Sequence, residues 1–400
     1  MPRSRDLLSL QEAMDWLGVS RATIDRWRRQ KQLPYIKIGK EVLVDRHKLD
    51  AWVRLHGHDP HEAAPVAEAA PSSPNVVTVG YQSGAALLWS TLVVKQLGLF
   101  EEELNAARPN GRIRVQWVNA PNGMELVEEL IAGRVQIASV GDYPIIASRA
   151  LSRILPRFDP LLIGFAGKTR GGSGISLVAP AGGGYGPLPS SLTERGISTV
   201  ANSSASYRLR EWMKGAGLNG DPVHYRRMSD CLSGLVEGRI GAAMLWEPYL
   251  TWAQTLGAGY PLASDGAGDD YLTGLLTDGG WAARHEDVVI AYLRAHLKAH
   301  AFIRAEPDRA ARLVHEGSGF PVEVVYRVLA NIRWDASIYM RDLLTLKRLG
   351  EGQSELLPGA SGAGGLDSAN RYLQEAASSL RLPLLPDSGQ VGEWSREAIY

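Results

Sequence analysis

From residue 76 onward, short apolar runs typical of β-strands alternate with segments of helical periodicity. After about Asp287 the pattern is mostly helical. Such alternation favours α/β sheets with parallel strands. We therefore predict an α/β fold for residues 75–400, with strands at Val76–Tyr81, Ile113–Val118, Gln136–Val140, Leu161–Phe165, Ile175–Ala179, Ser198–Ala201, Val223–Tyr225 and Ala242–Leu245.

Glycine-rich and polar loops follow several of these strands. Ligands of α/β sheets bind outside the carboxyl ends of the strands, and backbone N–H groups at helix starts suit carboxylate, sulfonate or phosphate groups. The last strand ends in Trp246-Glu247-Pro248, which places one indole and one carboxylate at such an end. The loops that the sequence singles out are 80–84, 120–123, 141–144, 202–206 and 246–248.

Residues 1–55 have a different pattern. Ser9 and Glu12 fit a capping box before a helix that Gly18 ends, and Ser20 can cap a second, basic helix from Arg21 to about Gln30. A β-hairpin over residues 35–44 follows. Two short helices joined by a glycine-containing turn are typical of a helix-turn-helix.

Charge is distributed unevenly between the two parts of the chain. Residues 1–55 hold 12 basic and 7 acidic residues, whereas the remainder holds 31 basic and 36 acidic residues. A basic N-terminal domain on a mildly acidic remainder indicates that the N-terminal domain binds a polyanion.

The stretch LLSLQEAMDWLGVSRATIDRWRRQKQLPYIKIGKEVLVDRHKLDAWV resembles the excisionase-type, MerR-like winged helix-turn-helix family. The resemblance implies that the second helix enters the major groove of DNA and that the hairpin is a wing. A basic helix that only solvates a surface or docks a partner protein is the alternative. The residues that would face bases or phosphates are Arg21, Thr23 and Arg26 on the helix, with Lys37 and Lys40 on the wing.

Residues 75–400 include the stretches VTVGYQSG, ELIAGRVQIASVGDYPIIAS and LVEGRIGAAMLWEPYL. Through these stretches, this part of the chain resembles the type II periplasmic solute-binding proteins of the taurine, aliphatic sulfonate, nitrate and thiamine-pyrimidine-precursor group. The resemblance implies two lobes with hinges near 165–175 and 265–280, which close on a ligand. Ordinary capping, turn or core roles are the alternative for each residue. The residues proposed for the cleft are Gln82, Ser83, Asn122, Asp142, Ser203, Ser204, Trp246 and Glu247, with Ser203 and Ser204 on an anionic group and Glu247 on an amine or ring N–H.

Residues 56–74 contain four prolines and five alanines, and we expect a linker there. The histidines at 56, 58 and 61 lack a further ligand, so we expect no metal site, and no cofactor is predicted. The single cysteine, the lack of a signal-peptide pattern and the lack of a long apolar run favour a cytoplasmic protein without a membrane partner.

Two functions fit these features. The first is a one-component transcriptional regulator whose partners are double-stranded DNA and a small-molecule effector, acting as a dimer or higher homo-oligomer. The second is an enzyme of the solute-binding fold, similar to desulfinases or pyrimidine-precursor synthases. We predict no catalytic residues, because Cys231 lies in an apolar helical stripe and the loop after the first strand carries Gln82-Ser83-Gly84 where desulfinases use a cysteine.

Overall fold

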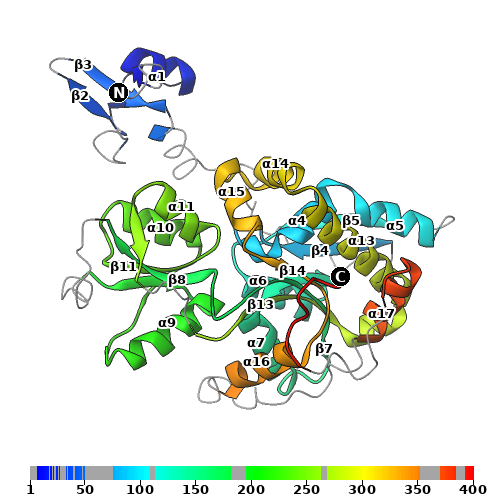
Figure 1. Ribbon diagram of the computed structural model, residues 1–400. Helices are drawn as coiled ribbons and strands as arrows, with labels where there is room; N and C mark the ends of the chain where they lie inside the picture. Colours follow the sequence, from blue (N-terminus) through cyan, green and yellow to red (C-terminus); the bar gives the residue numbers. More distant parts are fainter. Residues whose placement is uncertain are drawn as a thin grey trace.

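In the residues that the structure describes, the chain forms three β-sheets (Figure 1). The structure is a computed structural model. The described residues are 7–17, 19, 21, 24–25, 27, 33, 35–38, 41–46, 48–49, 75–108, 113–181, 195–262, 268–351, 370–383 and 392–400.

The N-terminal part confirms the expected capping box and hairpin. Ser9 N donates to Glu12 Oε2 at 2.7 Å, and Glu12 N donates to Ser9 Oγ at 3.2 Å, at the start of α1 (Leu10–Leu17). The hairpin consists of β2 (Ile36–Ile38) and β3 (Glu41–Asp45). A short strand that the sequence did not indicate, β1 (Leu7–Ser9), pairs with β3 and completes the sheet.

This small domain has its own apolar core. Ile24, from the segment expected to form the second helix, is fully buried. Trp27 packs against the same core. The buried side chains come from positions spread over the whole segment, namely Leu10, Ala13, Ile24, Leu33, Val44 and Leu49.

The second sheet has six strands and lies in the first lobe of the remaining chain. Its order is β14-β7-β13-β6-β4-β5. The strands β4, β5 and β6 are parallel, whereas β13, β7 and β14 are antiparallel to their neighbours. Their bounds are β4 (Val76–Tyr81), β5 (Arg114–Asn119), β6 (Ile137–Gly141), β7 (Pro160–Thr169), β13 (Tyr271–Asp278) and β14 (Arg333–Trp334).

The third sheet has five strands and lies in the second lobe. Its order is β10-β9-β11-β8-β12, with β9, β10 and β11 parallel. Its bounds are β8 (Ile175–Pro180), β9 (Ile197–Val200), β10 (Val223–Tyr225), β11 (Ala242–Trp246) and β12 (Gly259–Pro261).

The predicted α/β fold is therefore confirmed, and parallel pairing holds for three strands in each of the six-stranded and five-stranded sheets. The chain passes from the first lobe to the second between β7 and β8, and it returns between β12 and β13. These passages overlap the hinges proposed near 165–175 and 265–280. Most of the proposed hinge at 265–280 is strand β13, which pairs with both β6 and β7 in the six-stranded sheet.

Helices cover both faces of the six-stranded sheet. Neighbouring residues of β7 point to opposite faces, so that Leu162 joins one apolar cluster and Ile163 the other. One face is covered by α4 (Trp89–Gln96), α5 (Leu99–Ala107), α13 (Glu286–Ala305) and α17 (Asn370–Ser379), and the other by α6 (Gly123–Ile131), α7 (Asp142–Ser152) and α16 (Met340–Glu351).

The remaining helices complete the two lobes. The second lobe carries α9 (Ser204–Gly215), α10 (Met228–Val236) and α11 (Tyr249–Thr255), and the first lobe carries α12 (Gly279–Arg284), α14 (Pro307–Ser318) and α15 (Val322–Leu329). Contacts between α11 and α15 join the two lobes on one side. No helix in the described ranges is long and apolar enough to cross a membrane.

Candidate functional site

A cleft lies where strand ends of the two lobes face each other. The first lobe contributes the ends of β4 and β5, and the second contributes the ends of β10 and β11. At its inner end is a cavity of about 30 Å³, which is the space of one or two water molecules. Its lining residues are Ser83, Gly84, Asn119, Ala120, Pro121, Arg227, Met228, Ser229, Trp246 and Tyr249.

The inner cavity adjoins an outer cleft of about 740 Å³. Both spaces share the stretch Asn119-Ala120-Pro121. Asn122, Glu125 and Glu128 from the first lobe line the outer cleft, and His224 and Arg226 line it from the second lobe. A ligand can thus place one end in the inner cavity while its other end extends toward solvent.

Ser83 and Asn119 hold each other in place at the inner cavity. Asn119 Oδ1 accepts a hydrogen bond from Ser83 N at 3.0 Å, and Asn119 Nδ2 donates to Ser83 Oγ at 2.9 Å. The sequence prediction included Ser83 but missed Asn119. The available signal was a polar residue as the last residue of a strand, β5.

Arg227, a cationic residue, is among those that line the same cavity. It lies directly before α10, at the position that caps this helix, and Ser229 follows in the first turn. Backbone N–H groups in the first turn of a helix and a guanidinium group both favour an anion. The sequence prediction did not include Arg227, although its place two residues after the end of the short strand β10 was visible.

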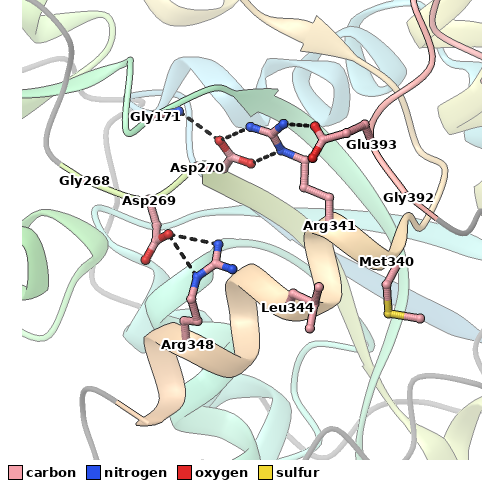
Figure 2. A pocket seen from close by; sticks show the side chains of 10 residues that line it. All are labelled: Gly171, Gly268, Asp269, Asp270, Met340, Arg341, Leu344, Arg348, Gly392 and Glu393. Carbon is pink, nitrogen blue, oxygen red and sulfur yellow. Dashed lines mark hydrogen bonds and ion pairs between the residues drawn. The ribbon is translucent and has the colours of Figure 1, made fainter.

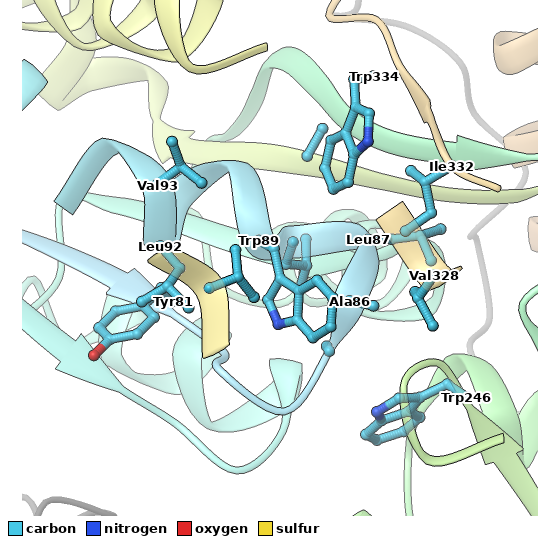
Figure 3. Packing of buried hydrophobic residues seen from close by; sticks show 14 of the residues in the cluster. Tyr81, Ala86, Leu87, Trp89, Leu92, Val93, Trp246, Val328, Ile332 and Trp334 are labelled. Atoms are coloured by element: carbon cyan, nitrogen blue, oxygen red, sulfur yellow. The ribbon is translucent and has the colours of Figure 1, made fainter. Parts of the chain in front are cut away.

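Trp246 closes the cavity from the second lobe. Its indole N–H donates to the carbonyl oxygen of Gly84 at 2.8 Å, while Trp89 donates its indole N–H to the carbonyl oxygen of Ser83, also at 2.8 Å. Two indoles therefore fix the turn after β4. Figure 3 shows Trp89 beside Ala86 and Leu87, with Trp246 on a separate element.

The structure places the other predicted ligand residues in supporting positions. Gln82 is buried and donates to the carbonyl oxygen of Ser139 at 3.0 Å. Asn122 lines the outer cleft and caps α6 by accepting Glu125 N at 3.0 Å. Ser203 Oγ accepts Ser206 N at 3.1 Å in the capping box of α9.

Ser204 and Asp142 lie at the contact between α9 and α7, outside the residues that line the two spaces. Ser204 Oγ accepts Tyr143 N at 3.4 Å. Asp142 is paired with Arg208 of the second lobe. These two predicted residues therefore join the lobes to each other.

Glu247 lies beside the cavity with both carboxylate oxygens bonded to Thr251. Oε1 accepts the Thr251 hydroxyl at 2.8 Å, and Oε2 accepts Thr251 N at 3.0 Å. Burial raises the pKa of Glu247 to about 7, although these hydrogen bonds act in the opposite direction. Near neutral pH this group is thus part neutral and part ionised.

Cys231 is fully buried, and burial raises the pKa of its thiol to about 12. Its side chain belongs to the large apolar core that includes Leu232 and Leu235. At neutral pH the thiol is protonated and shielded from solvent, so it does not supply a nucleophile. Within the described ranges, no group of His, Cys, Asp or Glu side chains is arranged to hold a metal ion.

The DNA-binding prediction falls partly on described residues. Arg21 is 68% exposed and pairs with Asp25 at 3.5 Å. The backbone of Lys37 lies in β2. Thr23, Arg26 and Lys40 lie outside the described residues.

Comparisons with known proteins agree with both parts of this description. Residues 7–54 match the model of a helix-turn-helix domain family. Over 265 residues, which are 65% of this chain and 76% of the relative, the sequence is 24% identical to an Escherichia coli (strain K12) protein named as an aliphatic sulfonates-binding protein.

Solved structures show the same fold. The alkanesulfonate-binding protein SsuA from Xanthomonas axonopodis pv. citri, bound to MOPS, matches with a TM-score of 0.56 and 19% identity over 72% of this chain and 96% of its own. The periplasmic nitrate-binding protein NrtA from Synechocystis PCC 6803 matches with a TM-score of 0.57 and 11% identity over 77% of this chain and 90% of its own. The chain thus joins a helix-turn-helix domain to a C-terminal region with the fold of the periplasmic solute-binding proteins.

Proposed function

We propose that this protein is a cytoplasmic one-component transcriptional regulator that binds DNA through residues 1–55 and senses a small molecule in the cleft of residues 75–400. The observation that supports it is the presence of a helix-turn-helix domain and a two-lobed cleft with an arginine-lined cavity on one chain. Residues 56–74 are the proposed linker. A ligand can control DNA binding only if it binds two arrangements of the protein with different affinity.

The proposed ligand is a small oxyanion or a zwitterion with an oxyanionic head. Arg227 supplies the positive charge, the first turn of α10 supplies N–H groups, and Asn119 keeps the Ser83 hydroxyl beside the same cavity. The related proteins named for sulfonate or nitrate binding support this choice of head group. Sulfonates, nitrate and acidic pyrimidines form the first panel of probes.

We assign the predicted ligand residues two different roles within this proposal. Ser83 and Trp246 contact the ligand in the inner cavity, and Asn122 contacts it in the outer cleft. The remaining predicted residues shape the cleft through bonds to other parts of the protein, and they are Gln82, Asp142, Ser203, Ser204 and Glu247.

The proposed DNA contacts are Arg21, Thr23, Arg26, Lys37 and Lys40. A single small basic domain binds DNA mainly through phosphate neutralisation, so specific binding requires two of them on a two-fold site. We therefore propose a homo-oligomer, most simply a dimer. Closing of the cleft would change how two such domains are presented to DNA.

The test measures DNA binding by the full chain with and without ligand. Fluorescence anisotropy on a fragment from the protein's own promoter, at low salt, is expected to show binding whose affinity changes at least about fivefold with an effective probe. Unchanged DNA affinity at saturating probe would contradict the proposal. Consumption of the probe by the purified protein would instead favour an enzyme.

The cavity assignment has its own test. Calorimetric titration with the effective probe is expected to show a loss of affinity of about 10- to 100-fold for Arg227→Met, since a charged hydrogen bond contributes about 1.5–3 kcal/mol. Arg157→Met is the matched control, because Arg157 is exposed and lies outside the residues that line the cleft. Equal affinity in both variants would remove Arg227 from the site.

A further inference from the structure

A salt bridge that is shielded from solvent joins the two lobes beside the cleft. Arg208 lies on α9 of the second lobe and is 2% exposed, and Asp142 begins α7 of the first lobe and is 1% exposed. Arg208 Nη2 donates to Asp142 Oδ2 at 2.8 Å, and Nη1 donates to Oδ1 at 3.3 Å. Both guanidinium ends therefore meet one carboxylate of the other lobe.

The same guanidinium also contacts the segment through which the chain returns to the first lobe. Arg208 Nη2 donates to the carbonyl oxygen of Asp270 at 3.0 Å, and the guanidinium carbon lies 5.1 Å from the ring centre of Tyr271. Nη1 donates in addition to the carbonyl oxygen of Ser204 at 3.2 Å. Arg208 thus connects α9 with a hinge passage and with the start of α7.

The return passage is itself tied to the first lobe. Asp270 accepts hydrogen bonds from Arg341 Nη2 and from Gly171 N, both at 2.9 Å. Figure 2 shows Asp270 between Gly171 of the first passage and Arg341 of α16. Asp270 therefore links the two passages and α16 by hydrogen bonds, and Arg208 of the second lobe bonds to the same residue.

The two charges depend on each other in the arrangement that the structure shows, in which this pair joins the lobes and which is here called closed. Separating the lobes would expose both groups to water, which stabilises each charge independently. In the closed arrangement, removal of one partner leaves the other charge buried and unpaired, which is strongly destabilising, whereas removal of both leaves no such charge. The Nε atom of Arg208 is buried without a hydrogen-bond partner in the described structure, so the guanidinium depends on its Nη contacts.

We propose that Asp142 and Arg208 are positioning residues whose pairing allows the two lobes to close, because either charge left alone opposes closure, and that the pair so sets the affinity of the cleft for its ligand. Asp142 then acts through Arg208 and has no direct contact with the ligand. The consequence for ligand affinity rests on the proposed function of the cleft. The consequence for the separation of the lobes is independent of the proposed function. It can be measured on protein to which no ligand has been added.

A second salt bridge between the lobes provides a matched control. Arg226 donates from Nε and Nη2 to Glu125 at 2.9 Å for both bonds, across the outer cleft. Its side chain is 65% exposed, so water screens the pair. Exposed pairs contribute little to stability, and we expect this one to affect closure far less than the buried pair.

The experiment measures the separation of the lobes by double electron–electron resonance on the full chain. Spin labels on Glu128→Cys and His224→Cys report the distance between opposite walls of the outer cleft. Cys231 is fully buried, which protects it from labelling. Asp142→Asn and Arg208→Met are each expected to shift the closed-to-open ratio at least tenfold toward longer distances.

The double variant Asp142→Asn/Arg208→Met is expected to return most of the population to the short distance, because it leaves no unpaired charge. Arg226→Gln is expected to keep the ratio within about twofold. Circular dichroism and a cooperative thermal transition identify folded variants. If Asp142→Asn does not fold, Arg208→Lys replaces it, because a lysine cannot form the two parallel bonds, and a smaller shift in the same direction is expected.

The proposal is overturned if the single variants keep the short distance, or if the double variant is as open as the single ones. Titration of wild type and variants with ethanesulfonate then tests the affinity. Weaker binding by the open single variants supports the positioning role. Absence of ethanesulfonate binding by wild type counts against the ligand class in the proposed function, while the distance measurements still decide whether closure depends on the pairing of the two charges.

Discussion

Trp246 of the second lobe donates its indole N–H to the carbonyl oxygen of Gly84 in the first lobe at 2.8 Å. The backbone repeats this connection, since Ala86 N donates to the carbonyl oxygen of Glu247 at 2.8 Å. The end of β11 is therefore bonded to the turn after β4 at two successive residues. Gly84 and Trp246 thus line the inner cavity and also bond the two lobes to each other.

Replacement of Trp246 by Phe tests this double role. The change removes the donor for the Gly84 carbonyl and leaves that part-buried acceptor without this hydrogen bond, at a cost of up to about 1–3 kcal/mol. We expect a lower thermal unfolding temperature together with weaker binding of the effective probe. Trp212→Phe is the control, because Trp212 is partly buried on α9 and does not line the cleft. Equal unfolding temperatures for the two variants would contradict the assigned role of the indole N–H.

Gly141 is expected to be essential for close contact of the lobes. A Cβ atom added there would lie 2.6 Å from Ser204 Oγ on α9, which is too close for any real contact. Gly141→Ala should open the lobes and weaken probe binding. Gly141→Ala/Ser204→Ala should restore much of both, because the atom that clashes is gone.

Gly215→Ala is the control for that pair of variants, since a Cβ at Gly215 meets nothing within 4 Å. The same spin-label distances and calorimetric titrations provide the measurement. If Gly141→Ala/Ser204→Ala does not recover the short lobe distance and the probe affinity, the clash with Ser204 Oγ is not the reason that Gly141 is needed.

The pH dependence of stability should carry a contribution from Glu247. Its pKa in the folded protein is about 7, above the ordinary value of 4.5. Between those two pH values the folded state binds more protons than the unfolded state, so the free energy of unfolding falls as pH rises. The shift corresponds to roughly 3 kcal/mol, present below pH 4.5 and lost by about pH 7.

Glu247→Gln keeps the shape of the side chain and removes its titration. Chemical unfolding at pH 5.5 and pH 8 is therefore expected to show a smaller decrease with pH for this variant than for wild type. Glu102→Gln, at an exposed position of α5, should leave the wild-type decrease unchanged. An equal decrease in wild type and Glu247→Gln would exclude Glu247 as its source.

Arg21 is the described residue on which DNA binding can be tested most directly. Its side chain is 68% exposed, and its pairing with Asp25 is a solvent-screened contact. Arg21→Ala should weaken binding to promoter DNA. If Arg21 neutralises one phosphate, the slope of the logarithm of the binding constant against the logarithm of the salt concentration should become less steep by about one. Anisotropy titrations at several salt concentrations measure both quantities. Gln11→Ala, at an exposed position of α1, is the control.

Local pattern was sufficient for many of the elements. The capping box of Ser9 and Glu12 and the hairpin of β2 and β3 depend on residues near one another in sequence, and the run of apolar residues in each of β4, β5, β9 and β10 was enough to predict a strand. Strand β13 was not predicted as a strand. Its place in the six-stranded sheet of the first lobe follows from the return of the chain from the second lobe.

The sequence by itself determined that a basic helix-turn-helix segment precedes an α/β region with polar loops at its strand ends. Only the tertiary structure decided which of those loops meet. It put Arg227 and Asn119 beside Ser83, and it paired Asp142 with Arg208, which is 66 residues away. Periodicity reports which side of an element is buried, whereas the partner of a buried charge depends on the packing of lobes that are distant in sequence.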